Sequence, residues 1–121
     1  MSSFSCEGIL NFITPEQKKL LNARFSEPDA HVMTHEISGP LSISYDQAIS
    51  ILTALQLFGL TKNYILVYHN CEPDLAVSYV KFEEGLPSIP WLCPNCQEEV
   101  ESLQELSFGM MAISNQTIQF V

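Results

Sequence analysis

The chain has 121 residues and a formal net charge of −9, from five Lys and Arg against fourteen Asp and Glu. Its hydrophobic fraction of 46% predicts a folded protein and argues against intrinsic disorder. The longest apolar run, Tyr64-Ile-Leu-Val-Tyr68, is far shorter than the roughly 20 residues that a membrane-spanning helix needs, so no membrane segment is expected.

The charge and the start of the chain narrow the function classes further. No basic region followed by an apolar stretch opens the sequence, so we expect no secretory signal and a cytoplasmic location. Residues 1–68 carry six acidic and four basic residues, whereas residues 69–121 carry eight acidic and one basic residue. An acidic surface repels phosphate backbones and makes nucleic acid an unfavourable partner. The charge serves either solubility or the binding of a basic protein partner.

The first half of the sequence predicts helices. They are Pro15–Phe25, Asp29–Ile37 (ended by Ser38-Gly39-Pro40) and Tyr45–Phe58. A capping-box pattern starts the first helix at Thr14 and Gln17 and the third at Ser44 and Gln47, and Gly59 is expected to cap the end of the third. Helical spacing in the third helix predicts a buried stripe of Ala48, Ile51, Leu52, Leu55 and Phe58.

The second half predicts strands, at Tyr64–His69, at Ala76–Phe82 and once or twice within Met110–Val121. The apolar tail is interpreted as a strand pair that closes the core, with a partly exposed patch for a partner as the alternative. We therefore expect one α+β domain over residues 1–121. Its helical part is 1–68, and its antiparallel, strand-rich part is 69–121.

A Cys-x-x-Cys pattern, Cys93-Pro-Asn-Cys96, is the most informative motif of the sequence. Structural zinc sites reuse such turns because the turn presents two thiolates on one side and directs backbone amides at them. In the cytoplasm, cysteines are expected as thiols or metal ligands and not as disulfides. Upstream, Cys71 supplies a third thiolate, and His69 or Asp74 supplies the fourth ligand. His69 is favoured because imidazole is the more frequent zinc ligand.

The cysteines allow two other interpretations. They could be unrelated buried thiols, since free Cys is often buried; Cys6 in particular is interpreted as a packing residue. Alternatively, Cys93 and Cys96 could form a redox dithiol, but the βαβ context of thioredoxin-like proteins is missing. The acidic run Glu98-Glu99-Val100-Glu101 is also expected to raise thiol pKa values, which disfavours redox chemistry.

With these motifs in place, the chain resembles a winged helix that runs into a zinc ribbon. This arrangement is found in general transcription factors of the transcription factor E type and in small bacterial adaptor domains. The resemblance covers residues 14–100 and is one of architecture. A zinc ribbon holds its metal with two ligand-bearing turns, called knuckles. The chain departs from this pattern in the first knuckle, around Cys71, which lacks a second cysteine, and at Gln97, where a knuckle usually has glycine.

The function expected from these features is that of a non-enzymatic adaptor that binds proteins and carries one structural Zn²⁺. The alternatives are a winged-helix transcription regulator that binds DNA and a thiol–disulfide redox protein. DNA binding is disfavoured because the predicted third helix carries no Lys or Arg.

His31 and His35 have the spacing of one helix face but lack a zincin motif, and are interpreted as a surface pair. The expected partner is a basic protein or a larger assembly that contains this chain; an oligomer is also compatible with the sequence.

Overall fold

The computed structural model describes residues 2–5 and 10–121. Within this part of the chain the α-helices are α1 (Pro15–Arg24), α2 (Thr34–Leu41) and α3 (Tyr45–Leu57), and short 3₁₀ turns are η2 (Phe82–Glu84) and η3 (Leu103–Glu105). The strands are β1 (Ser2–Phe4), β2 (His31–Met33), β3 (Thr61–His69), β4 (Ser78–Lys81), β5 (Trp91–Leu92), β6 (Glu99–Val100), β7 (Leu106–Ser114) and β8 (Ile118–Phe120). The predicted α+β class is confirmed.

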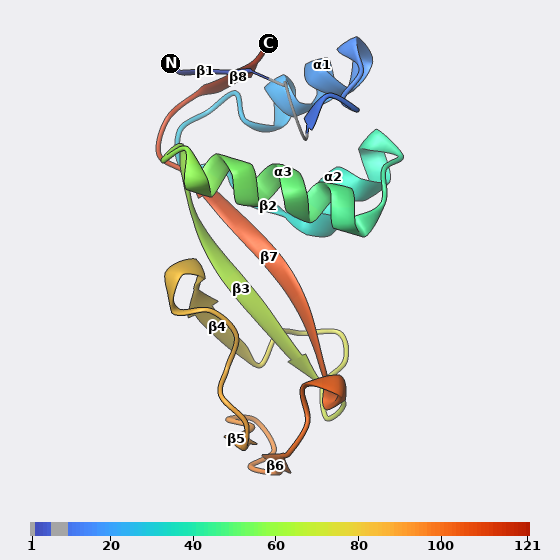
Figure 1. Ribbon diagram of the computed structural model, residues 1–121, viewed down its shortest axis with the longest axis vertical. Helices are drawn as coiled ribbons and strands as arrows, with labels where there is room; N and C mark the ends of the chain where they lie inside the picture. The colour runs from blue at the N-terminus through green and yellow to red at the C-terminus, as the bar shows by residue number, and fades with distance from the viewer. Residues whose placement is uncertain (1, 6–9) are drawn as a thin grey trace. The chain divides into compact units, whose positions relative to one another are not determined.

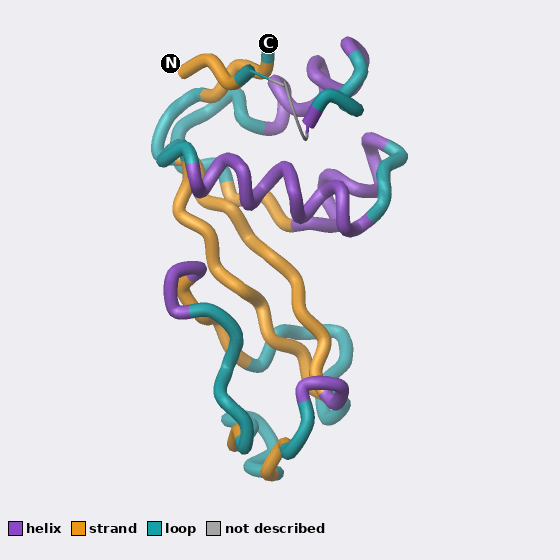
Figure 2. Tube along the Cα trace, viewed as in Figure 1, coloured by secondary structure: helices purple, strands orange, loops and turns teal. Residues whose placement is uncertain are grey.

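The strands form one larger sheet and two small ones (Figures 1 and 2). The four-stranded sheet has the order β2-β7-β3-β4, and in it the long strands β3 and β7 lie side by side. In the small sheets β1 pairs with β8 in parallel and β5 pairs with β6 in antiparallel fashion. The sequence did not predict β1, because three residues carry too little periodicity to indicate a strand.

The chain folds into two compact units. Unit 1 contains the chain up to Asn63 together with Met111–Val121, and unit 2 contains Tyr64–Met110. Unit 1 holds the helices with β1, β2 and β8, and unit 2 holds β4, β5 and β6. Met111–Val121, which the sequence analysis groups with the strand-rich part, belongs to the helical unit.

The capping motifs fix the ends of α1 and α3 as the sequence predicts. The hydroxyls of Thr14 and Ser44 each accept a hydrogen bond from the N–H of the glutamine three residues later, and that glutamine's amide oxygen accepts from the N–H of the cap. At the other end of α3, Gly59 has φ +76°, which is a backbone conformation that favours glycine. The Leu60 N–H then bonds back to the Leu55 carbonyl at 2.9 Å, so α3 ends in a Schellman motif.

The bounds predicted for the second helix, Asp29–Ile37, are wrong, although residues 34–37 are helical. His31–Met33 forms strand β2, opposite Met111–Ile113 of β7, and the helix runs instead from Thr34 to Leu41, through the expected stop at Ser38-Gly39-Pro40. Val32 is fully buried in that sheet, so tertiary pairing outweighs the local helical pattern. Pro40 lies in the last turn of this short helix, and Ser42 ends the helix with φ +54°.

Glu36 joins α1, β2 and α2. Its carboxylate accepts from the Met33 N–H at 2.9 Å and forms an ion pair with Arg24 at 2.7 Å. Arg24 also donates to the His31 carbonyl at 3.0 Å. Burial raises the pKa of Glu36, but the Met33 N–H and the Arg24 guanidinium together hold that pKa below its usual value. These contacts fix the turn from β2 into α2.

The core of unit 1 includes the buried face of α3. Ala48, Ile51, Leu52 and Leu55 of the predicted stripe are buried, whereas Phe58 is 73% exposed, so the prediction was wrong at this position. The helix ends at Leu57, and Phe58 is its C-terminal cap, where helical periodicity no longer decides which way a side chain points. The predicted burial of the tail is confirmed at Met110, Ile118 and Phe120.

Unit 2 has a smaller core. It is built around the buried Val67, Val100 and Leu106, against which partly buried side chains pack: Val80, Ile89, Trp91 and Phe108. Val67 comes from β3, whereas Trp91 and Val100 are opposite each other in the β5–β6 pair. This core therefore holds the β5–β6 pair against the end of β3.

Among the described residues, no helix combines the length and the apolar character that crossing a membrane would require.

Replacing Leu55 with alanine should lower the free energy of unfolding by about 2–5 kcal/mol, because it removes fully buried atoms and leaves a cavity. The matched control is Leu57→Ala, at a position that is 72% exposed, which should change stability by less than about 0.5 kcal/mol. Urea unfolding followed by circular dichroism measures both. Equal effects would contradict this assignment of the core.

Candidate metal centre

The connections that follow β3 and β5 bring four potential metal ligands together. His69 is the last residue of β3, and Cys71 follows in a turn closed by the Glu72 N–H bonding to the His69 carbonyl at 3.0 Å. Cys93 and Cys96 lie in the connection between β5 and β6. All four residues belong to unit 2.

Hydrogen bonds within the second connection shape the Cys93–Cys96 turn. The Cys93 N–H donates to the Glu98 carbonyl at 3.0 Å, and the Gln97 N–H donates to the Cys93 carbonyl at 2.8 Å. Trp91↔Val100 and Leu92↔Glu99 are the strand pairs that flank it. The turn is thus a hairpin loop anchored by buried Val100, and this holds both of its thiols at one end of the β5–β6 pair.

The ligand atoms of His69, Cys71, Cys93 and Cys96 all lie within 4.8 Å of one another. The Sγ atoms of Cys71 and Cys93 are 3.7 Å apart, and the Cys96 Sγ lies 3.5 Å from the His69 Nδ1. Tetrahedral zinc, with bonds of about 2.3 Å to sulfur and about 2.0 Å to nitrogen, separates two sulfurs by about 3.8 Å and sulfur from nitrogen by about 3.5 Å. The donor set therefore fits a tetrahedral Zn²⁺ ion in composition and in these two spacings.

The cluster is half buried. His69 and Cys93 are buried, whereas Cys71 and Cys96 are exposed. The side-chain amide of Asn95 donates to the Cys71 Sγ at 3.4 Å, and so joins the second loop to the thiol of the first. Hydrogen bonds of this kind orient metal-bound thiolates and spread their charge. Nothing in the sequence indicates that Asn95 would face the other loop, so sequence reasoning missed it.

The thiols of the Cys-x-x-Cys motif differ in acidity. Burial raises the pKa of Cys93, but the backbone N–H groups of Cys96 and Asn95 and the neighbouring thiols outweigh burial and lower the pKa to about 7. The Glu98 N–H favours the Cys96 thiolate, yet desolvation and the other two thiols raise the pKa of Cys96 above its usual value. The expectation that nearby glutamates raise the thiol pKa values was wrong for Cys93, because backbone N–H groups stabilise its thiolate.

Other candidate residues lie apart from this cluster. Asp74, the alternative fourth ligand, is not among the residues that the structure brings together here. Cys71, Cys93 and Cys96 are free thiols, whereas Cys6 lies outside the described residues. His31 is in β2 and His35 in α2, and both are exposed, so they do not share a helix face.

Gln97 occupies the position at which the resemblance leads one to expect glycine. Its φ is +63°, in the left-handed region, which a glycine would adopt without strain. The turn thus keeps the backbone geometry of a knuckle without the usual residue. The conformational free energy that this left-handed residue costs is offset by two interactions. They are the Gln97 N–H bond to the Cys93 carbonyl and the packing of the β5–β6 pair.

Comparison with known proteins gives no relative from which a role could be transferred. The chain matches no protein-family model, no curated protein and no solved structure. The interpretation of the site therefore depends on the geometry described above.

We expect purified protein to contain about one zinc ion per chain and His69→Ala to lose it, because the substitution removes one of four donors. Asp74→Asn is the matched control and should retain the metal. Inductively coupled plasma mass spectrometry measures the ratio of metal to protein. Loss of zinc from Asp74→Asn with retention in His69→Ala would reverse the assignment of the fourth ligand.

Substitutions at Gln97 should test the strained turn. Gln97→Val should lower the melting temperature and weaken metal binding, because a left-handed conformation costs about 1–2 kcal/mol for an ordinary residue and more for a β-branched one. Gln97→Gly should leave both unchanged or improved. Thermal denaturation of the metal-loaded variants checks this, and identical melting temperatures for Val and Gly would contradict it.

Proposed function

We propose that the chain is a non-enzymatic protein-interaction module whose unit 2 is held together by a structural Zn²⁺ ion. One observation carries the proposal: three cysteine sulfurs and a histidine nitrogen meet within 4.8 Å, with two spacings that match the edges of a zinc tetrahedron. When bound, the metal would cross-link the loops after β3 and β5.

The donor set favours a structural role over catalysis. Three thiolates and one imidazole fill all four positions of a tetrahedral zinc ion, so no position is left for water or substrate. Catalytic zinc sites keep such a position open. The metal would therefore stabilise the fold, and binding would be the task of the surrounding surface.

The order of elements supports the winged-helix resemblance. Helices α1, α2 and α3 precede β3, with β1 before α1 and β2 between α1 and α2. Strand β3 follows α3 directly and pairs with β7. The segment between β3 and β7 carries the β4, β5 and β6 strands and the metal ligands. In this proposal the ribbon-like part is an insertion between the two long strands and does not follow the winged helix as a separate C-terminal part.

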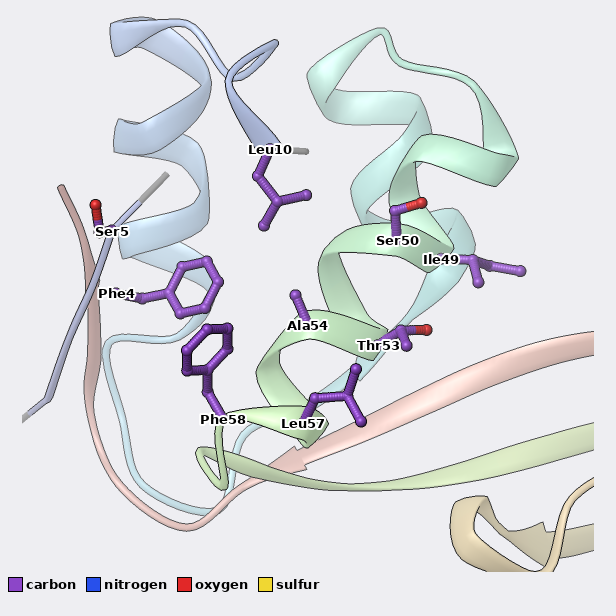
Figure 3. A pocket seen from close by; sticks show the side chains of 9 residues that line it. All are labelled: Phe4, Ser5, Leu10, Ile49, Ser50, Thr53, Ala54, Leu57 and Phe58. Carbon is purple, nitrogen blue, oxygen red and sulfur yellow. The ribbon is translucent and has the colours of Figure 1, made fainter. Parts of the chain in front are cut away.

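The surface of α3 favours a protein partner over DNA. A cavity of ≈ 480 Å³ lies between α3 and the N-terminal segment, and none of the described residues that line it is charged (Figure 3). Leu57 and Phe58 at its rim are more than 70% exposed. A helix that reads DNA needs basic side chains that contact phosphates and polar side chains that contact base edges. The described residues on this face include no basic side chain and few polar ones.

A redox function is the second candidate, because the lowered pKa of Cys93 would make its thiolate a nucleophile near neutral pH. However, the backbone N–H groups that lower this pKa are also the groups that support zinc-bound thiolates. The motif also lies in a hairpin loop between β5 and β6, and not at the start of a helix as in thioredoxin-like enzymes.

Removal of the metal tests the proposal. Adding a chelator to the protein should increase hydrogen exchange in residues 64–110 much more than in α1 and α3, because only unit 2 contains the ligands. Fluorescence anisotropy with labelled duplex DNA should show no salt-dependent binding.

Two results would contradict this function. Micromolar, salt-dependent DNA binding would favour a transcription regulator instead. Protein that is purified without metal and forms a Cys93–Cys96 disulfide that dithiothreitol reverses would favour the redox candidate.

A further inference from the structure

A groove lies beside the candidate metal centre, between the two loops that supply its ligands. It has a volume of ≈ 290 Å³ and is lined by residues of both loops: Glu72, Leu75, Ala76, Val77, Pro94 and Asn95. Leu75 is 65% exposed, and Glu72 is the one charged side chain among the described residues of the lining. The lining therefore combines apolar side chains with polar groups and a carboxylate.

The charge around the groove selects the kind of partner. Residues 64–110 carry eight acidic side chains and one basic side chain, Lys81. Asp74 is exposed two residues after Glu72, and Glu98 and Glu99 are exposed after the Cys-x-x-Cys turn. A surface of this sign attracts cationic segments and repels phosphate backbones. The long side chains of Lys and Arg suit such a groove because their apolar stems pack on carbon while their charged ends reach carboxylates.

The two walls of the groove are connected through the ligand cluster. Glu72 and Leu75 follow Cys71, whereas Pro94 and Asn95 lie between Cys93 and Cys96. The walls meet where the Sγ atoms of Cys71 and Cys93 are 3.7 Å apart and where Asn95 donates to Cys71. Without a metal, the loops would keep the Asn95–Cys71 hydrogen bond and the shared core of unit 2, but they would lose the cross-link between their ligands.

We propose that this groove is a docking site for a segment of a partner protein in which lysine or arginine alternates with apolar residues, and that zinc controls access by holding the walls together. The inference rests on the proposed metal site and names the partner class for that module. A cationic side chain pairs with Glu72 and Asp74, and an apolar neighbour packs on Leu75 and Val77.

The experiment titrates ¹⁵N-labelled, zinc-loaded protein with a capped ten-residue peptide of lysine, leucine and serine. A peptide of the same length in which glutamate replaces every lysine is the control. The lysine peptide should shift the amide signals of residues 72–77 and 94–95, and raising the salt concentration should weaken binding, because exposed charge pairs are screened. The glutamate peptide should cause no shifts.

Two variants separate docking from metal binding. Glu72→Gln should weaken peptide binding about threefold, the size expected for one exposed ion pair, and Leu75→Ser should weaken it further. Both should keep the zinc content and melting temperature of the unchanged protein. The chelated protein should lose peptide binding, even where its α3 signals are retained.

Several outcomes would overturn the docking site. They are equal shifts with both peptides, shifts confined to the α3 surface at Leu57 and Phe58, and peptide binding that survives chelation. Binding of a single-stranded oligonucleotide at residues 72–77 in preference to the lysine peptide would overturn the proposed partner class. Failure of the metal site itself would be recognised separately, as protein without zinc whose His69→Ala variant is as stable as the original.

Discussion

The arrangement of unit 2 depends on the meeting of four ligand atoms from two loops. The buried core of this unit is small, centred on Val67, Val100 and Leu106. In a segment this short a hydrophobic core alone rarely contributes more than about 3–5 kcal/mol, and small folds add a metal or disulfides to compensate. The described cysteines are free thiols. The Cys₃His cluster therefore fills the place that a cross-link would occupy in such a fold.

A requirement to gather four ligand atoms explains two local features of unit 2 that would otherwise lower its stability. Gln97 has a left-handed backbone, and Cys93 is a buried thiol with a pKa of about 7. The strained residue lets the turn direct N–H groups at the sulfur of Cys93, and these N–H groups favour the thiolate form that a metal binds.

The two units differ in surface chemistry. In the described part of the chain, unit 1 presents a cavity with an uncharged lining, beside Leu57 and Phe58 exposed at the end of α3, and unit 2 presents a groove that contains Glu72 between its ligand loops. Exposed apolar side chains that gather around a cavity mark interaction sites, whereas a surface of one charge sign attracts segments of the opposite charge. The two surfaces suit different kinds of segment. The proposed adaptor role would use both surfaces.

The sequence by itself determined what local rules control. Thr14 with Gln17 and Ser44 with Gln47 set the helix starts, Gly59 set the end of α3, and the pattern of cysteines with His69 selected the residues that cluster. The sequence is sufficient to predict these features because a helix cap or a Cys-x-x-Cys turn is formed by residues only a few positions apart. Only the tertiary structure decided that His31–Met33 is a strand, that Phe58 is exposed and that Asn95 reaches Cys71. Each of these depends on partners distant in the sequence, such as β7 for β2 and the first ligand loop for Asn95, and periodicity along one segment carries no information about such partners.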